Sequence, residues 1–343
     1  MAALEPRPAL DEMDARVVAA VQRDPRASYA QLAAMIGASE TTVQRRLQRL
    51  RSSGAIVVIG VVDAQMCGLG DPALVYLSTE PRATLRVAHT LAARSDVRFV
   101  CIVNGHNDIV CELIVRDRIH LANVLLAQLS AIDGVRSTST AIVLRTYKTR
   151  DEWSRDLLAD AGAGAGAPEH DTREAGSRRR VLDDLDQLLI AALREDGRRS
   201  YVDLSAELGI SETAVARRLR ALTEAGQVGV TALVDPLIMG FGVEGFLHFK
   251  IDPSRIESVA RFLSRRREVR WLAATAGRSD LTCEAIFRDN TSLHEFITGV
   301  IGDVMGIREF EVDLELQTIK RAFRLLVDPD PPVQDAQAQQ AIA

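Results

Sequence analysis

Two short helical segments carry the residues whose types and spacing best suit chemistry with another molecule. The segment SETTVQRRLQRLRSSGAI begins at Ser39, and SETAVARRLRALTEAGQV begins at Ser211, 172 positions later. Arginine can donate two parallel hydrogen bonds to guanine, glutamine can do the same to adenine, and threonine can contact a thymine methyl group. Because such a helix presents its N-terminal half to the base edges of a major groove, both segments favour double-stranded DNA as a partner.

An apolar triplet in each segment determines which side chains stay available for DNA. Val43, Leu47 and Leu50 recur at helical spacing, so we expect them to face a core. Side chains at helix starts are suited to holding phosphates. We therefore predict DNA contacts from Ser28, Tyr29, Ser39, Thr41, Thr42, Gln44, Arg45, Arg46 and Arg49 in the first copy, and from Ser200, Tyr201, Ser211, Thr213, Arg217, Arg218 and Arg220 in the second.

A solvated surface is the ordinary explanation for a charged helix face, and three observations weigh against it here. The helix from Glu40 onward has several arginines but one acid, whereas the whole chain has a net charge of −5. That acid stands in the first turn, where it interacts favourably with the helix dipole. The arrangement of cap, glycine and apolar triplet also recurs in the second copy. DNA binding is therefore the favoured interpretation.

Two Gly-x-x-Asp patterns have residues that could bind a small molecule. They run from Gly105 to Asp108 in NGHNDIV and from Gly277 to Asp280 in AGRSDLT. Backbone N–H groups of a glycine turn can hold a carboxylate, and the aspartate can accept an ammonium group. Glycine and aspartate are also common in ordinary hairpin turns, and the residues alone favour that simpler explanation.

These patterns belong to one long unit that occurs twice in the chain. A shift of 172 positions aligns Leu10 with Leu182 and continues without a gap until Lys148 meets Lys320. Between the two units, residues 157–180 combine alternating alanine and glycine with mixed charge, which predicts a flexible linker. Residues 328–343 are polar, which predicts a disordered tail.

Each unit divides into a helical part and a mixed part. Residues 10–63 and 182–235 have the pattern of three helices and a short strand pair, as in a winged helix-turn-helix. Residues 70–152 and 242–326 alternate in the order of a ferredoxin-like domain, βαββαβ. In the first unit this order places strands at 72–79, 97–103, 108–115 and 135–148, and helices at 82–94 and 119–132. The predicted fold class is α+β.

Composition and cysteine usage narrow the kind of protein further. An apolar content of 47% and a length of 343 residues suit a globular chain of two or more domains. The four cysteines show no metal-ligand spacing, and Cys111 and Cys283 stand in apolar runs as expected for buried free thiols. No catalytic motif, secretion signal or membrane-length apolar run is present, so we expect a cytoplasmic protein that is not an enzyme and holds no cofactor.

The order and spacing of the whole unit resemble the leucine-responsive, or Lrp/AsnC, transcriptional regulators. The resemblance rests on LDEMDARVVAAVQRD, SYAQLAAMIGASETTVQRRLQRLRSSGAI, VVIGVVD and the Gly-x-x-Asp turns, and it covers about residues 10–152 and 182–326. Members usually carry one unit per chain, so the tandem form departs from the family. The resemblance implies regulation of transcription by a small effector such as an amino acid. It also implies an effector site lined by Gly105, His106, Asn107 and Asp108 in one unit and by Gly277, Arg278, Ser279 and Asp280 in the other.

The predicted sheet needs a partner on the face that its helices leave bare. In strand 97–103, Phe99, Cys101 and Val103 point one way and Val100 and Ile102 the other, so both faces are apolar. Such a strand is expected to be buried on both sides, against a second sheet of the same kind. Because family members pair their effector domains, the two units are expected to pair within one chain as a covalent pseudo-dimer, although pairing between chains stays open. The resemblance also implies a higher homo-oligomer.

The two recognition segments differ on the surface that would meet DNA. Thr42, Gln44 and Gln48 are replaced by Ala214, Ala216 and Arg220. A pseudo-dimer with unequal recognition helices would suit an asymmetric operator.

Two other interpretations stay open. Some siroheme decarboxylases are similar to this fold, and His106, His248 and Arg278 would be the candidate side chains around a tetrapyrrole. The chain could also be a metabolite-sensing module that no longer binds DNA.

Overall fold

The first helix-turn-helix domain is built from three capped helices. The computed structural model describes residues 10–149 and 182–326, which excludes the expected linker and tail. Helices α1 (Glu12–Arg23), α2 (Tyr29–Ile36) and α3 (Glu40–Ser52) follow one another. Ser28 and Ser39 cap the last two by accepting hydrogen bonds from the backbone N–H groups of Gln31 and Thr42, and Gly37 ends α2 in a left-handed conformation. These caps confirm the helix boundaries predicted from the sequence.

The second helix-turn-helix domain repeats this construction. It consists of α7 (Asp184–Glu195), α8 (Tyr201–Leu208) and α9 (Glu212–Glu224). Ser200 and Ser211 cap α8 and α9, and Gly209 ends α8. In both domains the buried side chains lie on one stripe of each helix, because apolar residues recur every three or four positions.

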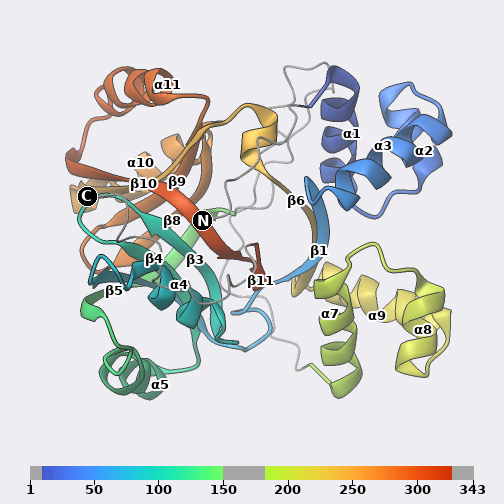
Figure 1. Ribbon diagram of the computed structural model, residues 1–343, viewed down its shortest axis with the longest axis horizontal. Coiled ribbons are helices and arrows are strands. Elements are labelled where there is room, and N and C mark those ends of the chain that lie inside the picture. Colours follow the sequence, from blue (N-terminus) through green and yellow to red (C-terminus); the bar gives the residue numbers. More distant parts are fainter. Residues whose placement is uncertain (1–9, 150–181, 327–343) are drawn as a thin grey trace, which may run out of the picture.

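One strand follows each three-helix group, and the two strands pair with each other. β1 (Ile56–Val62) and β6 (Val228–Val234) form an antiparallel two-stranded sheet. Ile59 lies opposite Thr231, its counterpart 172 positions later, so the pseudo-two-fold axis passes through this pair. The strand pair that we expected within each unit is therefore formed between units, because each unit supplies one strand. Figure 1 shows both helical groups on one side of this ribbon and the mixed domains on the other.

The mixed domains have the predicted strand and helix order. The first contains β2 (Asp71–Thr79), α4 (Thr84–Ala92), β3 (Val97–Val103), β4 (Ile109–Val115), α5 (Arg118–Asn123), η1 (Val124–Leu129) and β5 (Val135–Lys148). The second contains η4 (Pro236–Met239), β7 (Val243–Ile251), η5 (Pro253–Arg255), α10 (Ile256–Ser264), β8 (Val269–Ala276), β9 (Leu281–Phe287), α11 (Asn290–Glu295), η6 (Phe296–Ile301), β10 (Ile307–Arg321) and β11 (Arg324–Leu325). The second domain adds the short helices η4 and η5 and the strand β11 to the predicted order. In both domains the second helix also widens into a π-helical segment, η1 or η6, which the apolar periodicity does not reveal.

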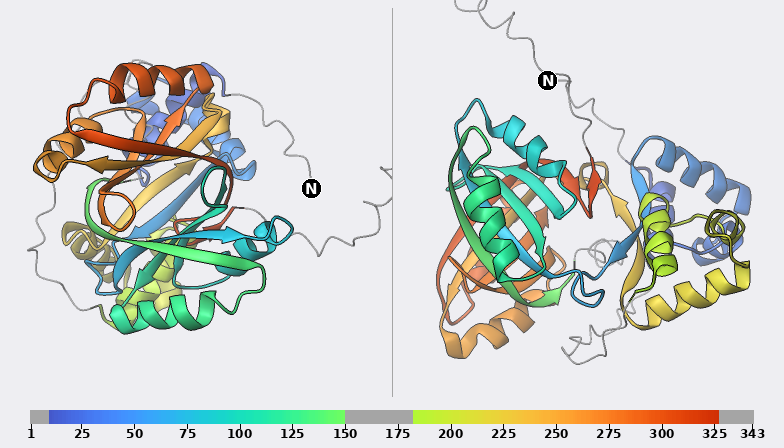
Figure 2. Two further views of the ribbon diagram at one scale, coloured as in Figure 1. Left: turned by 90° about the vertical axis from the view of Figure 1, so that its left-hand side faces the viewer. Right: turned by 90° about the horizontal axis from the view of Figure 1, so that it is seen from below.

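Two four-stranded sheets join at both edges into a closed structure. β5 pairs with β8, and β10 pairs with both β3 and β7, so the last strand of each unit extends the sheet of the other. Figure 2 shows the two sheets facing each other with their helices outside. Between the sheets lies an apolar cluster that includes Tyr76, Phe99, Cys101, Phe246 and Trp271. The second sheet predicted for the bare face is thus the other unit's, and the effector-type domains pair within one chain.

The two helical groups contact the paired sheets differently. Ile238, Phe241 and Ile286 of the second unit belong to the core cluster of α1, α2 and α3, and the Leu10 backbone N–H donates to the Ile238 carbonyl. The core around α7, α8 and α9 includes only a few residues outside the helical groups, among them Val62 and the half-buried Cys67. All four cysteines are free thiols, and Cys111 and Cys283 are buried, as predicted. No helix of the described residues is long and apolar enough to cross a membrane.

Candidate nucleic-acid interface and effector site

The side chains of α3 and α9 divide as their spacing predicts. Val43, Leu47 and Leu50 are buried, as are Val215, Leu219 and Leu222 in the second copy. Exposed positions among the predicted DNA contacts are Ser28, Ser39, Thr41, Gln44, Arg45 and Arg49 in the first copy, and Ser200, Tyr201, Ser211, Thr213, Arg217 and Arg220 in the second. Thr42 is half-buried because its hydroxyl lies against the Ser39 hydroxyl at 2.8 Å. The two helices therefore present an exposed polar face to solvent.

Arg46 and Arg218 stabilise their own domains, which differs from the predicted role in DNA contact. Arg46 donates to Asp11 at 2.6 Å and to Asp14 at 2.8 Å, and its side chain is 22% exposed. Arg218 makes the matching contacts to Asp183 and Asp186 at 2.7 and 2.8 Å. These hydrogen bonds raise the pKa of both guanidinium groups. Each arginine ties the recognition helix to the first helix of its domain, because it stands beside the buried stripe.

Arg45 and Arg49 have more of their side chains exposed to a ligand than Arg46 has. Arg49 reaches Asp14 with one nitrogen but keeps 59% of its side chain exposed. Arg45 is exposed, one position before Arg46. Arg45, its counterpart Arg217 and the exposed Arg220 on α9 thus remain well placed for an external acceptor.

A reciprocal contact between the helical groups involves Arg26 and Arg198, which are 172 positions apart and were not predicted. Arg198 donates to the carbonyls of Pro25 and Ala27 at 2.7 and 2.6 Å. Arg26 donates to the carbonyls of Gly197 and Arg199. The only sequence signal for this contact is that the two arginines align, in DPRASY and DGRRSY.

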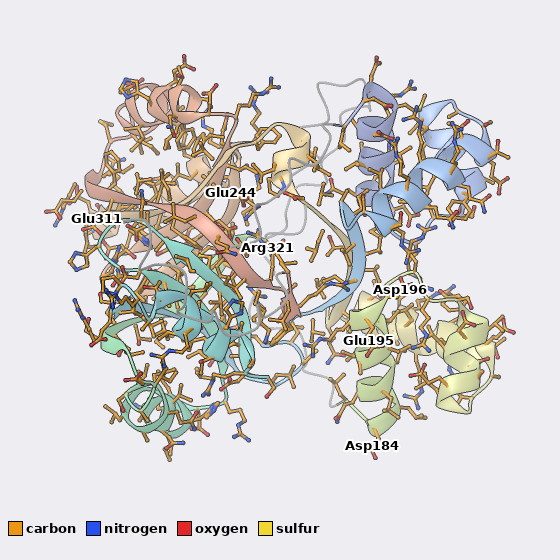
Figure 3. All side chains as sticks on the ribbon, in the orientation of Figure 1. Asp184, Glu195, Asp196, Glu244, Glu311 and Arg321 are labelled. Carbon is orange, nitrogen blue, oxygen red and sulfur yellow. The ribbon has the colours of Figure 1, made fainter. Side chains whose placement is uncertain are left out.

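The same contact occupies the two tyrosines that we predicted to hold phosphate. The Arg198 guanidinium lies 5.6 Å from the centre of the Tyr29 ring, and Arg26 lies 5.0 Å from the Tyr201 ring. Arg51 and Asp196 add an ion pair of 2.9 Å across the junction, where Figure 3 shows Asp196 between the helical groups. The two recognition helices are therefore held in one fixed pair.

The aspartates of the Gly-x-x-Asp turns stabilise the fold by accepting backbone hydrogen bonds. Asp108 accepts a hydrogen bond of 2.7 Å from the Thr79 backbone N–H at the end of β2. Asp280 accepts the matching bond of 2.8 Å from the Ile251 backbone N–H at the end of β7. Both carboxylates are thus engaged in fixing neighbouring strands, which limits the ammonium-binding role that we predicted for them.

Asp313 on β10 forms a polar centre between the two sheets. A Cβ atom at Gly105 would lie 2.2 Å from its Oδ1, so the first turn packs directly on this carboxylate. Arg278 of the second turn approaches Asp313 at 3.3 Å and Glu311 at 2.9 Å, and it stacks 4.8 Å from the Tyr76 ring. His248 Nε2 lies 3.4 Å from Asp313 Oδ2. Burial lowers the pKa of His248 despite this carboxylate, so its neutral form is favoured.

The two turns differ in how completely their own side chains fill them. In the second turn Ser279 is buried and bonds to Thr282 at 2.9 Å, and Arg278 lies across the polar centre. In the first turn Gly105 and His106 are exposed. Asn107 is 6% exposed, and its Nδ2 has no hydrogen-bond partner among the described residues. The first turn therefore keeps a buried donor available for a ligand.

Two paired helix-turn-helix domains on a ribbon, above two ferredoxin-like domains with turns at their interface, define a ligand-responsive DNA-binding regulator. Residues 10–51 and 182–223 match the AsnC-type helix-turn-helix domain, and residues 73–153 and 244–325 match the Lrp/AsnC ligand binding domain. The chain belongs to the Lrp/AsnC family of transcriptional regulators.

Relatives correspond to a single unit of this chain. The HTH-type transcriptional regulator Ptr1 of Methanocaldococcus jannaschii is 34% identical over 146 residues, which covers 42% of this chain and 99% of the relative. The HTH-type transcriptional regulator FL11 of Pyrococcus horikoshii is 29% identical over 145 residues, with 42% and 95% covered. The tandem arrangement thus carries two such regulators in one chain.

The complete two-unit arrangement has a likeness among solved structures. The siroheme decarboxylase NirDL superposes with a TM-score of 0.62 at 15% identity, covering 93% of this chain and 95% of that chain. At this identity the likeness concerns the fold alone.

Proposed function

We propose that this chain recognises an asymmetric DNA operator as a covalent pseudo-dimer in the cytoplasm. The observation that carries the proposal is the fixed pairing of α3 and α9, whose exposed faces differ. The β1–β6 ribbon and the reciprocal bonds of Arg26 and Arg198 hold the two domains together. Because Gln44 and Gln48 on α3 correspond to Ala216 and Arg220 on α9, the two half-sites would differ in sequence.

Selection of binding sites from random DNA tests this directly. The wild-type chain should select a site with two unlike halves. A variant that carries the α9 face on α3 (Thr42→Ala, Gln44→Ala, Gln48→Arg and Arg49→Ala) should select two like halves, with about 1–3 kcal/mol of altered discrimination per contacted base. The reciprocal variant (Ala214→Thr, Ala216→Gln, Arg220→Gln and Ala221→Arg) is the matched control and should select the other half-site twice. A palindrome selected by the wild type and by both variants would contradict the proposal.

Substitutions of the neighbouring Arg45 and Arg46 distinguish a role in DNA contact from a role in domain stability. Arg45→Ala should weaken DNA binding by about 1–3 kcal/mol and leave the melting temperature nearly unchanged, since Arg45 is exposed. Arg46→Ala should lower the melting temperature, because it leaves Asp11 and Asp14 without this partner. Binding should also fall steeply with salt, as phosphate neutralisation releases counterions. Weak, sequence-independent binding would instead favour a metabolite-sensing module without a DNA target.

We further propose that a small effector, an amino acid or a related metabolite, acts through the first turn. The free Asn107 amide donor and the exposed Gly105 and His106 support a site there, whereas the Arg278 side chain of the second turn is already paired with Glu311 and Asp313. An amino acid that binds should raise the melting temperature, and Asn107→Leu should reduce that shift more than Ser279→Ala does. A shift that depends on Ser279 and not on Asn107 would place the effector at the second turn. Assembly into a higher homo-oligomer is a separate part of the proposal, tested by light scattering.

The likeness in fold to NirDL keeps one enzymatic test worthwhile. Two of the three side chains considered for a tetrapyrrole are engaged otherwise, since Arg278 pairs with Glu311 and Asp313 and His248 is buried against Asp313, whereas His106 is exposed. These contacts support a regulator over a decarboxylase. Adding siroheme and recording the Soret band is the test, and tight binding followed by loss of carboxyl groups would reverse this conclusion.

A further inference from the structure

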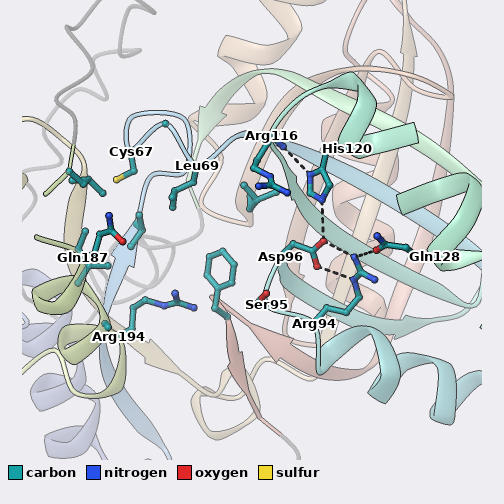
Figure 4. Close-up of a pocket in the computed structure, with 17 residues that line it drawn as sticks. Cys67, Leu69, Arg94, Ser95, Asp96, Arg116, His120, Gln128, Gln187 and Arg194 are labelled. Carbon is teal, nitrogen blue, oxygen red and sulfur yellow. Dashed lines mark hydrogen bonds and ion pairs between the residues drawn. The ribbon is translucent and has the colours of Figure 1, made fainter. Parts of the chain in front are cut away.

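A cavity of about 1110 Å³ lies between the second helix-turn-helix domain and the first effector-type domain. Its walls come from α7, the loop after β1, the loop before β3, the end of β4, α5 and the turn between β10 and β11 (Figure 4). Small-molecule sites are typically clefts of roughly 300–1,000 Å³, often at domain junctions. The cavity lies away from both Gly-x-x-Asp turns, none of whose residues line it.

The matching junction on the other side of the pseudo-two-fold axis is packed. Phe241 stands 172 positions after Leu69, and it is 8% exposed in the core cluster of α1, α2 and α3. Gln22 occupies the position of Arg194, and its Nε2 donates to the Ala232 carbonyl at 3.2 Å. The cavity therefore results from residue differences between the two units, since the counterparts of Leu69 and Arg194 close the other junction.

The cavity wall combines an apolar surface with excess positive charge. Leu69, Ile114, Ile190 and Phe323 provide the apolar part. Three arginines and one carboxylate line the cavity, and that carboxylate, Asp96, accepts from Arg94 at 2.7 Å. Arg116 and Arg194 stand on different sides of the space in Figure 4. An anion between these two would find cationic donors on both domains.

Arg194 is the lining cation that most needs an anionic partner. Its guanidinium stacks 4.4 Å from the Phe323 ring, and no carboxylate within the described ranges 10–149 and 182–326 forms an ion pair with it. Partial burial lowers the pKa of Arg194. Burial, followed by the charge of Arg194, also lowers the pKa of Lys320. Both lowered pKa values mean that the folded chain disfavours the charged forms of Arg194 and Lys320, and a negative group nearby would stabilise them.

We propose that this cavity is a binding site for an organic anion with an apolar ring or chain, held by Arg194 and Arg116 over the Phe323 and Ile190 surface. Because its walls belong to two domains, such a ligand would brace α7 against the first effector-type domain. The other helical group is already packed at its own junction, so the ligand would act on one recognition helix of the pair. That last consequence rests on the proposed DNA-binding function, whereas the site itself does not.

Fluorescence titration with the aromatic sulfonate 8-anilinonaphthalene-1-sulfonate tests the site without DNA. We expect saturable binding of one molecule per chain. The variant Cys67→Met, Leu69→Phe and Arg194→Gln carries the residues of the packed junction, and it should weaken this binding about tenfold or more. Arg118→Gln, which removes an exposed charge outside the cavity, is the matched control and should leave the affinity within about twofold. Equal affinity in the triple variant would overturn the proposal.

A single substitution checks the role of charge if the triple variant is unstable. Arg194→Gln should weaken binding of the sulfonate about tenfold, because a charge-assisted contact is lost. It should leave binding of the uncharged probe N-phenyl-1-naphthylamine unchanged. Equal loss of both probes, or of neither, would show that the cavity does not select anions. Since neither titration contains DNA, failure of the DNA-binding proposal would not affect the result.

Discussion

At the position where the first unit has Ala141 on β5, the second unit has Asp313 on β10, 172 positions later. Gly277 packs against Ala141, whereas Gly105 packs against a carboxylate that also meets Arg278 and His248. The backbone of the two units is alike, yet the polar groups between the sheets come mainly from the second. Duplication has thus preserved the elements, while residues between the two copies have diverged at these positions.

The ion pairs on the sheets show the same imbalance. Arg98 meets Glu112 at 2.7 Å in the first unit. The matching Arg270 and Glu284 belong to a network with Glu244, Glu315 and Arg321. Glu244 and Glu315 correspond to Pro72 and Val143, so the first unit has no carboxylates at those positions. Two halves of one fold therefore hold different amounts of buried charge.

The largest effect should come from the glycine that touches Asp313. Gly105→Ala should lower the free energy of unfolding by about 2–4 kcal/mol in urea titration. The residue has a φ of 108°, and the new Cβ would lie 2.2 Å from Asp313 Oδ1. Gly299→Ala is the control, since its Cβ would meet no atom within 4 Å. The double variant with Asp313→Ala, which copies the first unit, should recover part of the loss, and no recovery would assign the whole effect to backbone strain.

Substitution of Arg26 and of Arg198 tests whether the two helical groups are joined symmetrically. Arg198→Ala should cost about 2 kcal/mol of unfolding free energy, because two carbonyl acceptors lose their donor. Arg26→Ala should cost a similar amount, since its contacts are equivalent. Chemical denaturation of both variants, with Arg45→Ala as an exposed control, provides the measurement. Strongly unequal losses would show that one domain contributes more to the junction.

The buried carboxyl of the second unit should give the chain a pH dependence that the first unit lacks. Burial, with Glu284 and Glu244 nearby, raises the pKa of Glu315 to about 8. The unfolded chain releases this proton at lower pH, so stability should fall as the pH rises from about 5 to about 8. Glu315→Gln should remove part of that fall, worth about 1–2 kcal/mol at pH 8. Melting temperatures across this range provide the measurement. Glu309→Gln, on the exposed face of the same strand, should leave the profile unchanged.

The smallest effect concerns the two caps at equivalent helix starts. Ser28→Ala and Ser200→Ala should each cost about 1 kcal/mol of unfolding free energy. Ser28 belongs to a capping box in which the Gln31 side chain also accepts from the Ser28 backbone N–H. Ser200 donates its hydroxyl to Asp203 instead. Thermal unfolding of the pair should show whether the box makes the first helix start more costly to lose.

The local structure could be predicted from the sequence because it depends on near neighbours. The caps at Ser28 and Ser39 and the helix end at Gly37 follow from residue types within one or two turns. Strands 97–103 and 135–148 have the predicted bounds, since their apolar or β-branched runs end at turn residues. The duplication itself also followed from alignment of the chain with itself.

Contacts between the copies could not be predicted in the same way. The apolar, β-branched run VVIGVVD predicts a strand, but it does not identify the strand that completes the ladder, which is β6. Arg45 and Arg46 have the same chemistry, and only the approach of α1 decides that Arg46 is paired. Likewise, Asp108 is a residue type that could bind a ligand, yet in the structure it accepts a hydrogen bond from the Thr79 backbone N–H at the end of β2. Nothing in the sequence indicates this contact.

Joining the copies through the β1–β6 ribbon has a consequence for how the protein responds to dilution. Two separate chains that pair by such a ribbon dissociate as their concentration falls, by mass action. Here the partner strand is part of the same chain, so the pairing is a unimolecular equilibrium set by effective concentration. The two recognition helices would therefore stay together even when a cell contains very few copies of the protein.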